Sequence, residues 1–401
     1  MNAYWLDWLN LLGRWVHLIT GIAWIGASFY FVWLDNHLLA PRDAGDTDKG
    51  ISGEVWSVHG GGFYHAQKYR VAPALLPETL HWFKWEAYST WLSGFFMLCL
   101  VYYAGAATYL IDPSVAALTP LEAIAIGLGT LALGWLVYDG LCRSPLGRDD
   151  RLLGLAVLAL SVFAAWGLTH VFSGRGAFIH YGAMLGTLMV GNVFFVIIPG
   201  QRELIKAKLA GREPDPTPGL KAKQRSVHNT YFTLPVIFTM MSNHYALVFN
   251  HAYNWVLLIA ISIAGAAIRV YFVSRHKGQA KPAALVLGIV MLAGTAIAIS
   301  PAATPQPPAS AAVNPAERFA QVVQIVQTRC VACHAEHPTQ TGFAAAPKGV
   351  MLDTPTRVET QATLIYQQVS SHAMPLGNIT AMTEQERQLI AAWHDAGALS
   401  K

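Results

Sequence analysis

The sequence predicts an all-α protein, in which a polytopic membrane bundle of about eight transmembrane helices is followed by a small all-α domain at the C-terminus. Only 12% of the 401 residues are charged and 54% are hydrophobic, which is not the composition of a soluble globular protein. Apolar windows recur through the first three quarters of the chain, and amphipathic segments replace them near its end. We therefore expect a membrane domain over residues 1–300, a Pro- and Ala-rich linker over 301–314, and a soluble domain over 315–401.

Each apolar window has the length of a helix that crosses the bilayer core, which is about 30 Å thick. The first window has neither a basic leader nor a small-residue cleavage site, so we expect it to remain in the mature protein. The windows are Leu11–Leu34, Trp85–Leu110, Leu121–Asp139, Leu152–Phe172, Phe178–Pro199, Val227–Phe249, Trp255–Val273 and Ala284–Ser300.

The charges between the windows predict the orientation of the bundle. The first, third, fifth and seventh loops together hold eighteen Lys and Arg residues, whereas the second, fourth and sixth hold only Arg175. Because positively charged loops stay on the cytoplasmic side, both chain ends are expected outside. The formal net charge of +4, with no basic run beside interleaved aromatic residues, predicts no nucleic-acid partner.

A C-x-x-C-H motif from Cys330 to His334 marks the soluble domain. In such motifs two thiols form thioethers to a porphyrin and the histidine binds the iron, so we predict one covalent haem c on Cys330, Cys333 and His334. Met374, in a Pro-constrained loop, is the expected second iron ligand, with Met382 as the competitor. A redox dithiol or half of a zinc site is the alternative, but no second cysteine pair follows.

The segment around this motif resembles a class I cytochrome c domain over about residues 314–398. Helices are expected over Pro315–Thr328 and Thr356–Ser371, and a capping box at Thr383–Glu386 opens the last helix. Haem is attached to such motifs on the outer side of a bacterial inner membrane, where the loop charges also place the C-terminus. We therefore predict a multi-pass inner-membrane protein with both termini and the cytochrome c domain in the periplasm.

Histidines within the apolar windows point to a second cofactor, because ionisable groups in lipid are costly. His17 and His180 fall in the outer part of their windows. A neutral imidazole that faces a bundle interior is a good iron ligand, so we expect a haem b in the membrane domain on these histidines. The alternative is that both side chains only form hydrogen bonds between helices.

Three stretches of the membrane domain carry a family resemblance: Gly13–Tyr30, Val58–His65 and Leu80–Trp91. They resemble the membrane-bound urate hydroxylases that end in a cytochrome c domain, and the resemblance covers essentially the whole chain. It implies that urate is oxidised to 5-hydroxyisourate with oxygen from water, and that electrons pass through haem to a soluble or membrane cytochrome c of the respiratory chain, without hydrogen peroxide. The first window also resembles that of membrane porphyrinogen oxidases, which carry haem b on a similarly placed histidine, and this favours His17.

Urate oxidation needs positive charge for an anionic purine, an aromatic wall and a proton acceptor. The segment from His59 to Glu86 holds all three kinds of group, and the alternative is a charged loop with a glycine turn. The expected catalytic residues are His59, His65 and Glu86, and the expected substrate-binding residues are Lys68, Arg70, Trp82 and Lys84.

Two other functions fit the same chain. One is another membrane haem oxidoreductase, such as a porphyrinogen oxidase with a fused cytochrome c acceptor, which needs an apolar pocket open to lipid. The other is a transporter or sensor with a regulatory haem domain, which would use discontinuous helices. A urate pocket, in contrast, should contain Arg, Lys and His.

Overall fold

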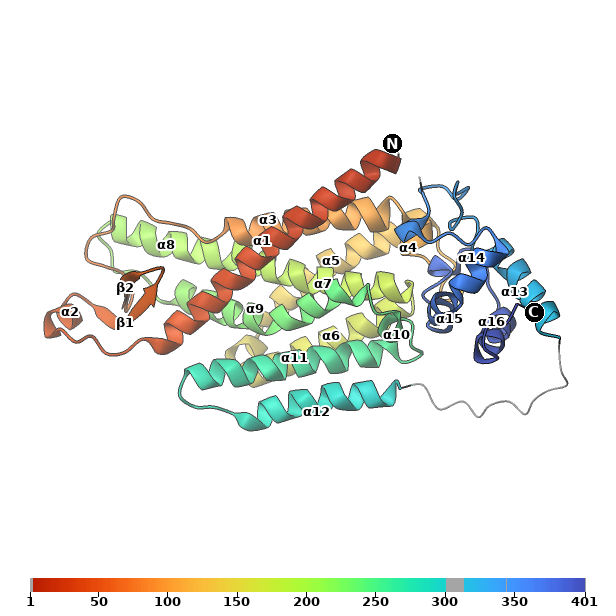
Figure 1. Cartoon of the computed structure of the whole chain (residues 1–401). Helices are drawn as coiled ribbons and strands as arrows, with labels where there is room; N and C mark the ends of the chain where they lie inside the picture. Colours follow the sequence, from red (N-terminus) through yellow and green to blue (C-terminus); the bar gives the residue numbers. More distant parts are fainter. Residues whose placement is uncertain (1–2, 301–313, 344, 401) are drawn as a thin grey trace.

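The computed structural model describes residues 3–300, 314–343 and 345–400, and the expected linker lies outside them except for Asn314. Figure 1 shows a long bundle of helices with the C-terminal domain against one end and a small β-hairpin at the other. We call these two ends the C-terminal-domain end and the hairpin end. Their separation positions every candidate site described below.

Helices account for each of the eight apolar windows, and two of them contain a turn of π-helix. The π-helical segments η1 and η3 continue α3 and α7 directly. The bounds are α1 (Ala3–His37), α3 (Trp85–Met97), η1 (Leu98–Tyr103), α4 (Ala106–Tyr109), α5 (Pro120–Arg143), η2 (Pro145–Arg148), α6 (Asp150–Thr169), α7 (Gly174–Gly191), η3 (Asn192–Ile197), α8 (Ile198–Leu209), α9 (Thr217–Ser242), α10 (Ala246–Phe249), α11 (Asn254–His276) and α12 (Pro282–Ala298).

Five helical stretches among the described residues are long and apolar enough to cross a membrane, as expected for a multi-pass membrane protein. The other three predicted windows also form helices, but α3 and α12 have only 13 and 17 residues, and α9 is more polar. The number of eight spans therefore stays a prediction. The five stretches are Tyr4–His37, Pro120–Arg143, Asp150–Thr169, Gly174–Leu209 and Asn254–His276.

Helix α7 is the centre of the bundle and packs on α3, α5, α6 and α9. Its close contacts depend on glycine: a Cβ atom on Gly182 would lie 2.0 Å from the Thr239 hydroxyl of α9. A Cβ atom on Gly127 of α5 would lie 2.7 Å from the His180 ring. Larger residues at these positions would force the helices apart, so the glycines set the helix spacing around α7.

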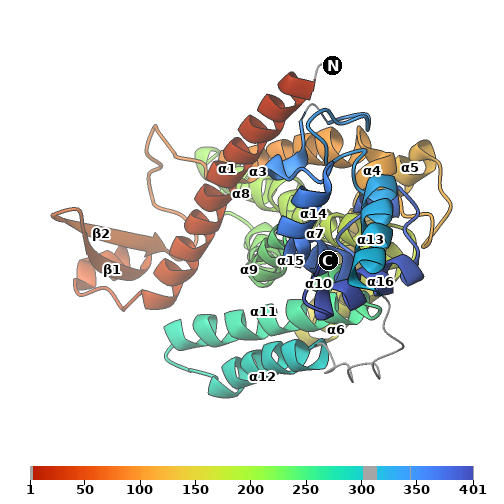
Figure 2. The same cartoon turned by 45° about the vertical axis from the view of Figure 1, so that its right-hand side comes forward.

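A β-hairpin follows α1 and the short helix α2 (Ala44–Asp48), so the all-α prediction is wrong over residues 51–69. Strand β1 (Ile51–His59) pairs antiparallel with β2 (Gly62–Tyr69). Gly60 and Gly61 form the turn with φ of +58° and +81°, backbone angles that suit a two-residue hairpin turn and favour glycine. Figure 2 shows the hairpin projecting beyond α1, away from the rest of the bundle.

The C-terminal domain is a small all-helical unit with its own apolar core. Its first helix confirms the expected one within a residue, whereas the second expected helix is broken at Gln361 into two. The predicted capping box is present, with Thr383 as the N-cap and Glu386 completing it. The elements are α13 (Pro315–Arg329), η4 (Pro347–Gly349), α14 (Pro355–Thr360), α15 (Ala362–Ser370), η5 (Leu376–Asn378) and α16 (Glu384–Asp395).

Candidate functional site

The C-x-x-C-H motif forms a tight turn at the end of α13. The backbone N–H groups of Cys333 and His334 both donate to the carbonyl of Cys330, at 3.1 and 2.9 Å. His334 Nδ1 is 2.9 Å from the Val350 carbonyl, which can only accept, so Nδ1 carries the proton. This hydrogen bond orients the ring and leaves Nε2 as the nitrogen that can bind a metal.

The two thiols do not have the properties of a redox dithiol. Burial raises the pKa of Cys330 to about 12, and burial also raises the pKa of Cys333. A redox dithiol needs a lowered pKa to produce a thiolate, so these cysteines lack that activation. Within the described ranges, no three His, Cys, Asp or Glu side chains form a cluster that could hold a metal ion.

The loop over residues 372–378, which we call the methionine loop, is held from both sides. The Met374 N–H donates to Gln368 O at 3.0 Å, and the buried Arg387 donates through Nη1 to the carbonyls of Met374 and Val369. Met374 is half-buried, whereas the competitor Met382 is 4% exposed inside the domain core. The surroundings thus fit Met374 as an iron ligand and Met382 as packing.

The methionine loop also contacts the membrane bundle. Asn250, after α10, donates through Nδ2 to the His372 carbonyl at 2.7 Å. A Cβ atom on Gly377 would lie 3.0 Å from the carbonyl oxygen of Thr108 and 3.2 Å from that of Ile111. The loop expected to carry the second iron ligand is therefore the contact between the two domains, at the C-terminal-domain end of the bundle.

Three of the predicted site residues lie on the hairpin, and Arg70 directly follows it. His59 is exposed beside its turn, and Arg70 is exposed after β2. Lys68 forms an ion pair with Asp35 at 2.7 Å. His65 Nε2 is 2.8 Å from Glu54 Oε2, and its ring stacks on Trp56 with centroids 4.2 Å apart.

Glu54 is the buried acid of this hairpin. The Arg42 backbone N–H and the side chains of His65 and Gln67 all hydrogen-bond its carboxylate. These hydrogen bonds hold the pKa of Glu54 below its usual value, and the bond from the Arg42 backbone has the largest effect. His65 is thus held in place by Glu54 and Trp56, and Glu54 is an acid that sequence patterns did not single out.

The other three predicted residues lie at the start of α3. Trp82 packs in an apolar cluster with Trp24 of α1, and the Lys84 ammonium lies 5.7 Å from the centre of the Trp82 ring. Glu86 Oε2 is buried and has no hydrogen-bond partner among the described residues. No hydrogen bond or ion pair within the described ranges joins these three residues to the hairpin, although Phe83 and Lys68 contact α1 one turn apart, at Phe31 and Asp35.

The two histidines predicted for haem b lie in different surroundings. His180 is fully buried, with Nδ1 2.8 Å from the Gly176 carbonyl and Nε2 3.3 Å from the Tyr103 hydroxyl. His17 uses Nδ1 for Thr90 O and the Ser93 hydroxyl, and its Nε2 makes no hydrogen bond in the described part of the chain. In both rings Nδ1 faces a backbone carbonyl; Nε2 is without a hydrogen bond in the described residues at His17 and contacts a tyrosine hydroxyl at His180, so the haem b ligands stay a prediction.

A buried polar network that sequence reasoning missed lies between α5, η3 and α9. Arg225 pairs with Asp139 at 2.6 Å and donates to the Asn192 amide oxygen at 3.1 Å. Asn192 in turn donates to the Tyr138 hydroxyl, which is 2.7 Å from His228 Nδ1. From sequence, Arg225 counted only as a loop charge, because its partners are more than thirty residues away along the chain.

His228 also lines a cavity of about 190 Å³ between α6, α7, α9 and α11. Tyr181, Tyr231, Ser161 and Ser262 contribute further polar groups to its wall. Most of the cavity wall is hydrophobic, and the polar network ends at His228 on one side of it. Its volume suits a small molecule and is too small for a porphyrin.

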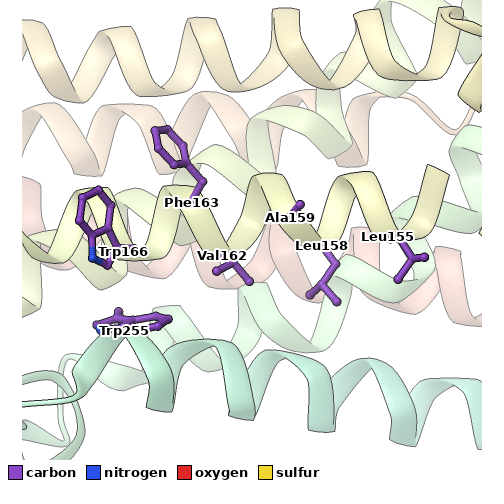
Figure 3. A pocket seen from close by; sticks show the side chains of 7 residues that line it. All are labelled: Leu155, Leu158, Ala159, Val162, Phe163, Trp166 and Trp255. Carbon is purple, nitrogen blue, oxygen red and sulfur yellow. The ribbon is translucent and has the colours of Figure 1, made fainter. Parts of the chain in front are cut away.

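A larger and shallower hollow of about 490 Å³ lies between α6 and α11 (Figure 3). Its lining is entirely hydrophobic, so it offers no group for an anionic substrate and suits the hydrocarbon chains of lipid. The lining residues are Leu155, Leu158, Ala159, Val162, Phe163, Trp166 and Trp255.

Comparison with known proteins adds an assignment for the membrane domain. A family model described as "Urate oxidase N-terminal" matches residues 3–300. The chain belongs to this family. Membership of this family identifies a urate-related oxidoreductase. The matched region ends at residue 300, before the C-terminal domain begins. No curated protein and no solved structure matches the chain.

Proposed function

We propose that this protein is a cytochrome-c-linked urate hydroxylase of a bacterial inner membrane. Its membrane domain oxidises urate to 5-hydroxyisourate with oxygen from water, and its C-terminal domain is a periplasmic cytochrome c that passes the electrons to a respiratory cytochrome c. Family membership over residues 3–300 supports the substrate, and the apolar helices support the lipid environment. The family match does not cover the C-terminal domain, whose assignment as a cytochrome c rests on the C-x-x-C-H motif.

The observation that carries the proposal is the contact between the family-matched domain and the methionine loop. Cys330 and Cys333 would hold a covalent haem c, and His334 and Met374 would bind its iron. Such a haem supplies one-electron transfer at this site. Asn250 and the backbone around Thr108 hold the loop against the bundle, so electrons leaving the membrane domain have a short protein path to it.

The electron balance requires two single-electron transfers for each urate. Urate and water give 5-hydroxyisourate, two protons and two electrons, and one haem c accepts only one electron at a time. A haem b on His17 would hold the second electron within the chain, which is why we retain it in the proposal. The external acceptor is a soluble or membrane-bound cytochrome c of the respiratory chain.

The test is to add urate anaerobically to the purified, oxidised protein and to record its visible spectrum with a pyridine haemochrome assay. Reduction of a c-type haem, with no hydrogen peroxide formed, is the expected result. If dithionite reduces the haem and urate does not, the proposal is wrong. A b-type signal in the same assay would support the cofactor at His17.

The alternative of a porphyrinogen oxidase with a fused acceptor has less support. The family assignment names urate, and this is the observation that favours the urate hydroxylase. The same spectroscopic experiment, with a porphyrinogen in place of urate, separates the two functions.

A further inference from the structure

Three buried side-chain atoms in the described part of the chain have no hydrogen-bond partner: Glu86 Oε2, Arg269 Nε and Arg269 Nη2. Two of the three belong to one guanidinium. A buried polar atom without a partner loses its hydration and gains nothing in exchange, so proteins satisfy nearly all of them. Arg269 is therefore an unusual feature of the bundle that the family assignment does not explain.

Arg269 lies on α11 in the hairpin-end half of the bundle. The residue is only 6% exposed, and its guanidinium lies 3.9 Å from the centre of the Phe29 ring of α1. Tyr231 of α9 is near enough to interact with its charge, and Tyr231 also lines the 190 Å³ cavity. The arginine is thus enclosed by α1, α9 and α11, and an aromatic ring covers one face of it.

The two unpartnered nitrogens form one edge of the guanidinium. Nε–H and the neighbouring Nη2–H point in parallel, and this edge binds planar anions through two hydrogen bonds. Phe29 covers the face of the group and leaves the edge unused. A flat anion that presents two adjacent acceptors is therefore the ligand that matches the geometry.

Glu86 lies at a similar depth along α1. Thr90, one turn after Glu86, packs near Gly21, and the Phe83 ring, one turn before it, contacts Phe31 with centroids 4.8 Å apart. Glu86 therefore falls between these levels, within about one helical turn of Phe29 along α1. An acid and an arginine, each with a buried atom that has no hydrogen-bond partner among the described residues, thus lie at a similar depth.

We propose that Arg269 binds the substrate, urate, through its Nε–Nη2 edge, between α1, α9 and α11 at the hairpin end. This inference rests on the proposed function for the identity of the anion. Urate is planar, and in its anionic form a ring edge presents a carbonyl oxygen beside a deprotonated nitrogen. The proposal moves substrate binding from the exposed Arg70 and the ion-paired Lys68 to a buried arginine.

The experiment measures urate binding without turnover. The full-length protein is reduced with dithionite, so that it cannot accept electrons, and labelled urate is bound by equilibrium dialysis. Arg269→Gln should raise the dissociation constant at least about tenfold, because a charged, two-point hydrogen bond is lost. Arg269→Lys keeps the positive charge, so its dissociation constant should lie between those of the unmodified protein and Arg269→Gln. Arg275→Gln, an exposed charge on the same helix, is the matched control and should bind as the unmodified protein does.

Several outcomes would overturn the inference. The inference is wrong if Arg269→Gln binds urate as the unmodified protein does. An unchanged haem spectrum would show that this variant is folded. Binding lost in His228→Gln but not in Arg269→Gln would place urate in the cavity instead. Loss of co-purifying anionic phospholipid without loss of urate binding would assign the arginine to a lipid phosphate. If urate binds through Arg269 yet does not reduce the oxidised haem, the proposed function fails and the binding site stands.

Discussion

Glu86 is the predicted catalytic residue whose surroundings leave it free to act. Lys68 pairs with Asp35 and Lys84 lies over Trp82, so neither neutralises the Glu86 carboxylate. A general base contributes about 10²- to 10⁴-fold to a rate. We therefore expect Glu86→Gln to lower kcat for urate by at least about a hundredfold, with a smaller effect on KM. Steady-state kinetics with cytochrome c as acceptor measures both.

The exposed Glu78 provides the matched control, since Glu78→Gln removes a carboxylate from the same segment. Its kcat should equal that of the unmodified protein. A Glu86→Gln variant that retains full kcat would exclude this carboxylate as the proton acceptor. The remaining predicted candidates are His65, which is held by Glu54, and the exposed His59.

Glu54 makes the hairpin sensitive to acid. Hydrogen bonds from the Arg42 backbone and the His65 side chain lower its pKa, so the ionised carboxylate stabilises the folded hairpin. That contribution is complete above the ordinary carboxyl pKa of about 4.3 and is lost as pH falls through the lower, folded value. Amide hydrogen exchange over residues 51–69 should therefore accelerate below about pH 4, beyond the intrinsic effect of pH.

Glu54→Gln is the variant that tests this cause. Its amide cannot ionise, so its hairpin should exchange faster than that of the unmodified protein at neutral pH and should show little further acid sensitivity. Acid sensitivity equal to that of the unmodified protein would mean that another group opens the hairpin.

Arg387 holds the methionine loop through two backbone carbonyls. Arg387→Gln leaves the carbonyls of Met374 and Val369 without this donor, at a cost of about 1–3 kcal/mol if both stay buried. Because methionine ligation raises the potential of a c-type haem, we expect a lower midpoint potential and loss of the methionine-to-iron charge-transfer band. Arg318→Gln, on α13 of the same domain, should change neither. An unchanged potential in Arg387→Gln would show that the loop is held by other contacts.

At the scale of elements, the contact of η5 with α4 controls electron transfer in the proposed function. Gly377 has φ of +57°, and a Cβ atom there would press on two carbonyl oxygens of the membrane domain. Gly377→Ala should therefore loosen the docking and slow haem reduction by urate, while reduction by dithionite stays fast. Stopped-flow absorbance of the haem measures both rates.

Gly342→Ala separates docking from backbone strain. Gly342 also has a positive φ, of +97°, but a Cβ atom there meets nothing within 4 Å. Gly342→Ala should lower the stability of the C-terminal domain without slowing reduction of the haem by urate. Equal slowing in both variants would mean that domain stability, and not the contact with α4, sets the rate.

Helices were predictable where local signals are strong. The first helix of the C-terminal domain and the capping box at Thr383 match the expectation, because propensity and capping act within a few residues. The hairpin was missed although Gly60–Gly61 between alternating segments is a hairpin signal. Apolar-window analysis treats such a segment as a loop.

The candidate site was less predictable because its contacts join distant parts of the chain. Arg269 sits inside an apolar window, and only the placement of Phe29, 240 residues earlier, encloses it. The network around Arg225 likewise joins three helices. The hairpin residues looked like one site with Glu86 because they are close in sequence, but no hydrogen bond or ion pair among the described residues joins them to it.

At the scale of the whole molecule, the two ends of the bundle have different chemistry. The methionine loop contacts the C-terminal-domain end, while Arg269 belongs to the second half of α11 and Glu86 to the first turn of α3, and Figure 1 shows these parts of the two helices toward the hairpin end. Electrons from urate would thus cross much of a bilayer core of about 30 Å. The reaction should therefore be sided, with urate used from the hairpin side and electrons delivered on the other.

Sealed vesicles with the protein in a single orientation test this sidedness. With the C-terminal domain outside, a membrane-impermeant acceptor such as ferricyanide added outside should be reduced by urate trapped inside, and urate added only outside should give little reduction until the vesicles are opened with detergent. The loop charges predict that the hairpin side is cytoplasmic, which gives the orientation in the cell. Equal reduction with urate on either side would show that urate also enters from the C-terminal-domain end and would contradict the sidedness argued from Arg269.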